Sequence, residues 1–139
     1  MKNILITGGA GYIGAHVAEI LSQKKTNIFI VDNLSTGFKK LLNKKAHFTN
    51  LNILNTSKLK KIIIENKIDS IIHLAASLSI GVGEKNPKFY YKNNVLGTQS
   101  LLKACNKSLV KNFIFSSSAA VYQEGKKIVN EKSKVNPKS

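Results

Sequence analysis

The first residues that could bind a ligand are glycines near the N-terminus. Gly8, Gly11 and Gly14 stand three apart, and Gly9, Gly11 and Gly14 also fit the pattern G-x-G-x-x-G. In such a turn the first glycine permits a tight reversal, the middle one lets the backbone approach a diphosphate, and the last allows close packing of a helix. The diphosphate would lie at the positive end of that helix, against free backbone N–H groups. The spacing therefore predicts a dinucleotide-binding turn.

An acidic residue stands where the ribose of a dinucleotide needs one. Asp32 follows Gly14 by 18 residues and closes the next predicted strand. Its carboxylate can accept hydrogen bonds from the hydroxyls of the adenosine ribose and would repel a 2′-phosphate. We therefore expect NAD rather than NADP as the cofactor. The alternative, from the residues alone, is that Asp32 only ends a strand or caps a turn.

Alternating strand-like and helix-like segments are expected to position these residues. The predicted strands are 3–7, 28–31, 46–49, 70–74 and 112–115, and the predicted helices are 12–23, a second one capped by Thr56, and 87–107. The apolar positions expected to face the core are Ile13, Val17, Ile20 and Leu21, then Leu59, Ile62 and Ile63, then Val95, Leu102 and Cys105. This order predicts an α/β protein with a doubly wound, Rossmann-like parallel sheet, incomplete at about five strands in the order 3-2-1-4-5.

Composition limits the class of protein. A chain of 139 residues with 42% hydrophobic content suits one domain, or part of one. No apolar run reaches the roughly 20 residues that span a bilayer, and the N-terminus has no signal-peptide pattern, so we expect a cytoplasmic protein with no membrane partner. The single cysteine, Cys105, lies in a helical pattern, where we interpret it as a small buried hydrophobe. No metal site is predicted.

The formal charge of +15 raises the question of a nucleic-acid partner. All 22 basic residues are lysine and they are scattered, whereas recognition of bases and phosphates favours the forked side chain of arginine. We therefore interpret the lysines as a solvated surface and expect no nucleic-acid partner. The remaining alternative is electrostatic attraction of an anionic substrate or cofactor.

Four segments carry a resemblance to a known family. TGGAGYIGAH and VDNLSTG resemble the extended short-chain dehydrogenase/reductase superfamily, while YYKNNVLGT and FIFSSSAAVY resemble its nucleotide-sugar epimerases, above all the UDP-glucose 4-epimerases. The resemblance covers essentially all 139 residues and implies an isomerase of galactose metabolism. Such an enzyme oxidises the C4 hydroxyl of a UDP-sugar substrate with bound NAD and returns the hydride to the other face. Homodimerisation is implied as well. The alternatives are another nucleotide-sugar 4-epimerase or dehydratase, and a non-catalytic NAD-binding module.

The resemblance also implies roles for single residues at the cofactor. Tyr12 and Ile13 are expected to contact the pyrophosphate through their backbone, Asp32, Asn33 and Ser35 to hold the adenosine ribose, Asn52 and Ile53 to flank the adenine, and Leu74, Ala75 and Ala76 to line the dinucleotide groove. Asn52 replaces a carboxylate of the family by an amide, whose oxygen can still accept one hydrogen bond from the adenine amino group. Weaker binding is therefore expected at this position.

The opposite half of the site concerns Asn93, Ser118 and Leu78, and His73 is interpreted separately. Asn93 matches a family residue near the nicotinamide, although the residues alone favour a helix N-cap equally. By resemblance, Ser118 hydrogen-bonds the sugar hydroxyl that is oxidised and helps to pass on its proton, whereas serines at a strand end more often form turns. His73 ends a buried strand and is interpreted as a packed, hydrogen-bonded core residue rather than a base. Leu78 stands where the best-known epimerases often carry a lysine.

The family's base is the tyrosine of a Tyr-x-x-x-Lys motif on a helix. Tyr122 and Lys126 have that spacing, but Gly125 and the lack of a helical period disfavour a helix there. Residues 136–139 resemble instead the turn that precedes the family's catalytic tyrosine. We therefore expect residues 1–139 to be the N-terminal portion of an NAD-binding domain, from which the catalytic helix and the C-terminal substrate domain are absent, and to be incompetent alone.

Overall fold

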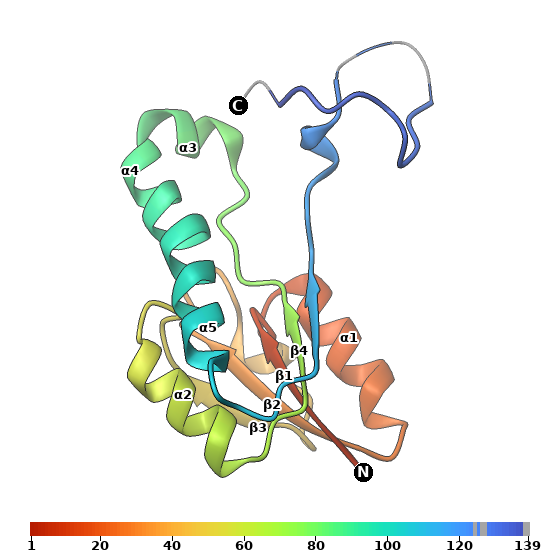
Figure 1. Ribbon diagram of the computed structural model, residues 1–139, viewed down its shortest axis with the longest axis vertical. Coiled ribbons are helices and arrows are strands. Elements are labelled where there is room, and N and C mark those ends of the chain that lie inside the picture. The colour runs from red at the N-terminus through yellow and green to blue at the C-terminus, as the bar shows by residue number, and fades with distance from the viewer. Residues whose placement is uncertain (124, 126–127, 138–139) are drawn as a thin grey trace.

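A five-stranded parallel sheet forms the centre of the molecule in a computed structural model that describes residues 1–123, 125 and 128–137 (Figure 1). The strands are β1 (Lys2–Thr7), β2 (Thr26–Asp32), β3 (His47–Asn50), β4 (Ser70–His73) and β5 (Asn112–Phe115). Their order is β3-β2-β1-β4-β5 and every neighbouring pair is parallel, which confirms the predicted class and order. Three residues named above, Lys126, Lys138 and Ser139, lie outside the described residues.

Helices cover both faces of this sheet. The helical segments are α1 (Tyr12–Ser22), the 3-10 turn η1 (Lys39–Leu41), α2 (Thr56–Glu65), α3 (Ile80–Lys85), α4 (Pro87–Tyr90), the π-helix η2 (Tyr91–Leu96), α5 (Gly97–Cys105) and the 3-10 turn η3 (Ala119–Val121). α1 packs on one face, and α2 and α5 pack on the other (Figure 1). The predicted helix 87–107 is thus three successive helical pieces that end at Cys105, and α3 was not predicted.

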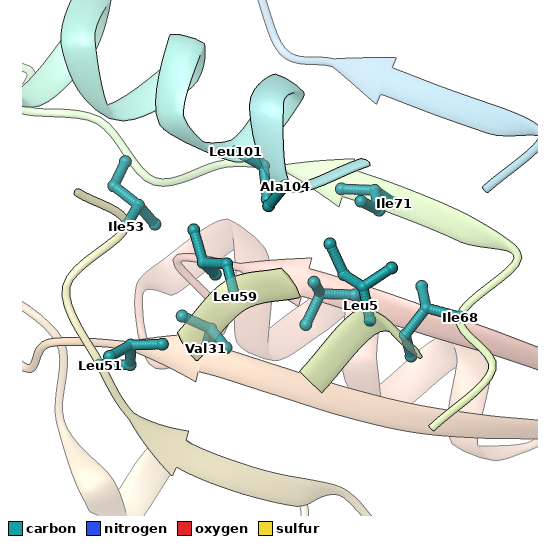
Figure 2. Packing of buried hydrophobic residues seen from close by; sticks show 10 residues of the cluster. Leu5, Val31, Leu51, Ile53, Leu59, Ile68, Ile71, Leu101 and Ala104 are labelled. Carbon is teal, nitrogen blue, oxygen red and sulfur yellow. The ribbon is translucent and has the colours of Figure 1, made fainter. Parts of the chain in front are cut away.

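Two apolar clusters hold these layers together, because alternate residues of each strand face opposite sides of the sheet. Leu5, Val31 and Ile71 pack against α2 and α5, and Figure 2 shows this cluster. Ile4, Ile6 and neighbouring isoleucines of β2 pack against α1. Because both faces of the sheet are covered, the sequences of the central strands are nearly continuous apolar runs.

The core-facing stripe of α1 differs from the prediction. Gly14 and Ala18 are its buried residues, with Val17 and Leu21 partly buried beside them. Ile13 and Ile20 are 56% and 62% exposed, so their prediction as core residues was wrong. The spacing 14, 17, 18 and 21 is a regular helical stripe, and its small residues let the helix approach the sheet closely.

The stripe of α5 is also displaced from the prediction. Gly97, Ser100, Leu101 and Ala104 are buried, whereas Val95 and Leu102 are 38% and 49% exposed and Cys105 is only partly buried. In α2, Leu59 and Ile63 are buried as predicted and Ile62 is partly buried. The cap of α2 is Asn55, whose side chain accepts the N–H of Lys58, instead of Thr56. The hydroxyl of Thr56 lies 2.7 Å from that of Ser100 and so joins α2 to α5.

Leu101 and Leu102 offer a matched test of which stripe faces the core. Leu101 is fully buried between α2 and the sheet, while its neighbour is half exposed. Leu101→Ala should lower the free energy of unfolding by about 3 kcal/mol, because it removes buried methyl groups and leaves a cavity. Leu102→Ala should change it by less than about 1 kcal/mol. Urea unfolding followed by circular dichroism measures both, and equal losses would contradict the packing described.

None of the helices in the described part of the chain has the length and apolar character required to cross a lipid bilayer.

Candidate dinucleotide-binding site

The glycine turn joins β1 to α1, and the backbone around it leaves no room for side chains at Gly8 and Gly14. Gly8 has a φ of 75°, and a Cβ there would lie 2.7 Å from the backbone N of Ala75. A Cβ on Gly14 would lie 2.7 Å from the Cα of Gly9. A Cβ on Gly11 would meet only the carbonyl oxygen of Gly8, at 3.3 Å. The fold therefore restricts Gly11 less than Gly8 or Gly14, and the space on its other sides suits a ligand that approaches the backbone.

The N-terminus of α1 presents donors toward this open space. Gly11 is the N-cap and provides no side-chain cap, and the first helical hydrogen bond runs from Ala15 N–H to the Gly11 carbonyl. The N–H groups of Tyr12, Ile13 and Gly14 have no acceptor among the described residues. Unpaired N–H groups at the positive end of a helix bind anionic oxygens, so the turn fits a diphosphate.

Asp32 lies at the end of β2, next to the glycine turn. It is 9% exposed, and its Oδ2 accepts the N–H of Ala10 at 3.0 Å while its Oδ1 accepts the N–H of Leu34 at 2.7 Å. The carboxylate therefore does cap a turn, as the simpler interpretation proposed. Each oxygen keeps a second lone pair, which leaves capacity for two ribose hydroxyls.

The loop after Asp32 folds back over the glycine turn. The side-chain oxygen of Asn33 accepts the N–H of Ser35 at 3.0 Å, and both residues are exposed. The N–H of Phe38 bonds the carbonyl of Ala10 at 3.0 Å, and a Cβ on Gly37 would lie 2.8 Å from the Cβ of Ala10. Sequence reasoning missed Ala10 and Gly37, although the glycine that closes VDNLSTG was a signal for such a close approach.

The two residues expected to flank the adenine follow β3. Backbone hydrogen bonding joins this segment to β2, since Leu51 N–H donates to the Asp32 carbonyl. The Oδ1 of Asn52 accepts the N–H of Leu54 at 2.9 Å, while the side chain of Ile53 is buried and packs against Gly97. Their contact with adenine stays a prediction.

The residues predicted to line the dinucleotide groove follow β4 and meet the glycine turn from the other side. Leu74 N–H donates to the carbonyl of Thr7 at 3.0 Å, and Gly8 packs against the backbone of Ala75. Leu74 and Ala75 are partly buried, and Ala76 is exposed. The carboxyl ends of β2, β1 and β4 thus bring together the residues predicted for the two sides of a dinucleotide.

Asn93 is not a helix N-cap, so that alternative was wrong. It lies inside η2, and its Nδ2 donates to the Oγ of Ser77 at 3.1 Å. The N-cap of this helical stretch is Asn86, which precedes Pro87 and accepts the N–H of Phe89 at 3.2 Å. An Asn-Pro pair is an ordinary helix-start signal and could have identified this cap from the sequence.

Ser118 and Tyr122 lie in the segment after β5. Ser118 is exposed and caps η3, where its Oγ accepts the N–H of Ala120 at 3.1 Å, so its hydroxyl proton remains available to another acceptor. Tyr122 follows η3 and forms an isolated antiparallel bridge with Val135. It is therefore not on a helix, as expected. Leu78, in the loop after β4, is 81% exposed.

His73 is the packed, hydrogen-bonded core residue that the sequence predicted. Its ring is 2% exposed and lies beside Phe113 and Phe115. The Nδ1 lies 2.6 Å from the hydroxyl of Thr7, and the Nε2 lies 2.8 Å from that of Thr98. Burial alone lowers the pKa of His73 to about 4. The ring is therefore neutral at pH 7.

The buried ring makes stability dependent on pH. Between a pKa of 6.5 in the unfolded chain and about 4 in the folded one, the unfolded chain binds a proton that the folded chain does not. Stability should therefore fall as the pH is lowered through this window, by about 3 kcal/mol in total. Urea unfolding from pH 7 to pH 4 measures the slope. His73→Asn retains the exposed His16 and His47 and should show a smaller slope; an identical slope would contradict the assignment to His73.

Comparison with known proteins shows which family this chain matches and which solved structures it resembles. Residues 4–139 match the NAD dependent epimerase/dehydratase family. The UDP-glucose 4-epimerase of Lactobacillus helveticus is 41% identical over 135 residues, which is 96% of this chain and 41% of that protein. The Brucella ovis UDP-glucose 4-epimerase, solved in complex with NAD, superimposes with a TM-score of 0.92 at 38% identity, over 99% of this chain and 42% of that one. A Thermotoga maritima UDP-glucose 4-epimerase, solved with UDP-glucose, superimposes with a TM-score of 0.91 at 36% identity, over 97% of this chain and 45% of that one. The chain thus spans about two fifths of the length of these relatives.

Proposed function

The chain belongs to the NAD dependent epimerase/dehydratase family, and we propose that it is the NAD-binding half of an enzyme that epimerises C4 of a UDP-hexose, interconverting UDP-glucose and UDP-galactose. One observation carries the proposal. Within the part of the chain that the structure describes, three N–H groups at the start of α1 have no acceptor, and they stand beside Gly11 and next to the carboxylate that ends β2. A dinucleotide needs an anion site and a hydroxyl acceptor in this arrangement.

The sheet order supports a proposed placement of the two halves of the cofactor. Asp32 ends β2, so the adenosine ribose lies on the β2 side, with Asn33, Ser35, Asn52 and Ile53 around the adenosine. The N–H groups of Tyr12 and Ile13 hold the pyrophosphate at the end of β1. The nicotinamide half then extends over Leu74, Ala75 and Ala76 after β4 toward Asn93. When bound, NAD accepts the hydride from C4 and returns it.

Ser118 is the residue of this chain that we assign to the substrate. It follows β5, on the nicotinamide side of the sheet order, and its hydroxyl proton is free to donate to the sugar oxygen. We assign the catalytic base and most of the sugar contacts to parts of the longer relatives that residues 1–139 do not match. Homodimerisation and a cytoplasmic location belong to the same proposal. Conversion of UDP-galactose by residues 1–139 alone would contradict this division of roles.

Asp32→Ala tests the cofactor site. Loss of the carboxylate should weaken NAD binding about 10- to 100-fold, because two charge-assisted hydrogen bonds to the ribose are lost. It should also reduce the preference for NAD over NADP, since the group that repels a 2′-phosphate is gone. Titration calorimetry with NAD and with NADP measures both effects.

Asp69→Ala is the matched control for that experiment. Asp69 also accepts a backbone N–H, from Asn3 at 2.7 Å, but it precedes β4 at the opposite end of the sheet. Its removal should lower stability and leave the Kd for NAD within about twofold of the unaltered chain. Equal effects of the two substitutions on the Kd would show that Asp32 acts only through the fold.

A further inference from the structure

A chain of hydrogen bonds, buried at Thr7 and partly buried at Thr98, runs from the end of β1 to the π-helix, and its donors can be assigned. The hydroxyl of Thr98 donates to the backbone carbonyl of Asn94 at 2.6 Å, since a carbonyl can only accept. Thr98 Oγ1 is therefore the acceptor for His73 Nε2–H at 2.8 Å. With the proton on Nε2, the Nδ1 of the neutral ring accepts the hydroxyl of Thr7 at 2.6 Å.

The far end of this chain holds the loop after β4. The side chain of Asn94 accepts the N–H of Ser77 at 2.8 Å and donates to the Ser77 carbonyl at 3.0 Å. Asn93 Nδ2 adds a bond to the Ser77 hydroxyl at 3.1 Å. Ser77 is thus held at its N–H, its carbonyl and its hydroxyl by two adjacent amides of η2. We call the three residues Ser77, Asn93 and Asn94 the amide clasp.

The chain of bonds fixes where the clasp lies relative to the sheet. Thr7 directly precedes Gly8, and His73 ends β4 directly before the groove-lining Leu74. Among the described residues, the hydrogen-bond and ring partners of His73 are neutral: the Thr7 hydroxyl from β1, the Thr98 hydroxyl from α5, and the Phe113 and Phe115 rings from β5. A π-helix departs from the regular bond pattern, and the Thr98 hydroxyl binds one of its carbonyls. The register of η2 is thereby tied to the sheet.

We propose that His73, as its neutral Nε2–H tautomer, is a positioning residue that sets the amide clasp against the nicotinamide half of the cofactor site. The inference rests on the proposed function, because it takes the nicotinamide half to lie beyond β4. His73 and Thr98 touch neither cofactor nor substrate in this account. They act by holding η2, and through it Ser77 and Asn93, at a fixed distance from the glycine turn.

Thr98→Val tests the inference with two ligands. Valine keeps the shape of threonine but removes both hydrogen bonds of its hydroxyl. NAD binding should weaken about tenfold, whereas binding of ADP-ribose, which has the same pyrophosphate and adenosine but no nicotinamide, should change by less than about twofold. Thr98→Ser keeps the hydroxyl and should bind NAD like the unaltered chain. Calorimetric titration of the full chain and its variants measures all of these affinities.

Taken together, the outcomes distinguish failure of the inference from failure of the proposed function. Unaltered chain that binds neither ligand overturns both. If the unaltered chain binds both ligands, the inference alone is overturned by either of two results: Thr98→Val loses affinity for NAD and ADP-ribose equally, or it loses affinity for neither. Hydrogen exchange gives a second measurement that needs no ligand: the amide of Ser77 should exchange at least about tenfold faster in Thr98→Val than in Thr98→Ser. Equal exchange in the two variants would overturn the inference, and Thr7→Val provides the same comparison at the other end of the chain of bonds.

Discussion

The Gly11→Val chain is expected to fold normally and to lose its affinity for NAD. Gly11 has φ −81° and ψ 173°, an extended backbone that valine adopts without strain, and a Cβ there meets only one carbonyl oxygen, at 3.3 Å. The added side chain would instead occupy the space beside the free N–H groups of α1, where the pyrophosphate must lie. NAD binding should weaken at least about 100-fold, while the free energy of unfolding changes by less than about 1 kcal/mol.

Gly81→Val is the control for this prediction. Gly81 lies in α3, and a Cβ there meets no atom of the described residues within 4 Å, so valine at this position tests the general effect of the residue type. Calorimetric titration and urea unfolding of both variants supply the comparison. Unchanged NAD affinity in Gly11→Val would refute the ligand as the reason for this glycine, and a large loss of stability would make Gly11 a structural residue.

Gly14→Ala, unlike Gly11→Val, should destabilise the fold itself. The new Cβ would lie 2.7 Å from the Cα of Gly9 and 2.9 Å from the carbonyl carbon of Gly8. Because backbone cannot rotate away as a side chain can, α1 would have to move from the sheet on which Ala18 packs. We expect a loss of about 4 kcal/mol, at the upper end for a single methyl group.

The matched substitution Gly81→Ala should be neutral or slightly stabilising, since alanine favours a helix and a Cβ there meets no described atom within 4 Å. Thermal and urea unfolding followed by circular dichroism compares the two. A Gly14→Ala chain with the stability of Gly81→Ala would show that the close approach of α1 to the sheet is not needed.

The strands and the glycine turn could be predicted because their signals are local. The apolar runs of β1 and β2 are long enough to fix strand and burial together, and Asp32 at the end of β2 follows from the spacing to Gly14. Because the predicted strands alternate with helices, and connections between parallel strands are right-handed, the strand order could be predicted as well.

The helix faces could not be predicted in the same way, because large apolar residues are not always the buried ones. α1 approaches the sheet on Gly14 and Ala18, which leaves Ile13 and Ile20 outside. α5 likewise packs on Gly97 and Ala104 in addition to Leu101. Close packing selects small residues at the contact, and a search for large apolar residues at helical spacing overlooks them.

The hydrogen bonds around His73 could not be predicted from the sequence, for a different reason. The histidine was correctly interpreted as a bonded core residue, yet its partners Thr7 and Thr98 stand 66 and 25 residues away in sequence. No local pattern encodes such pairs, which depend on the strand order and on the register of η2. Asn94 was overlooked for the same reason, although it binds Ser77 more extensively than the predicted Asn93 does.

The most direct test of the account is a crystal structure of the chain with NAD. We predict pyrophosphate oxygens within hydrogen-bonding distance of the Tyr12 and Ile13 N–H groups, and the adenosine ribose hydroxyls on the carboxylate of Asp32. Density for NAD at any other place, or a glycine turn closed by side chains of this chain, would contradict it.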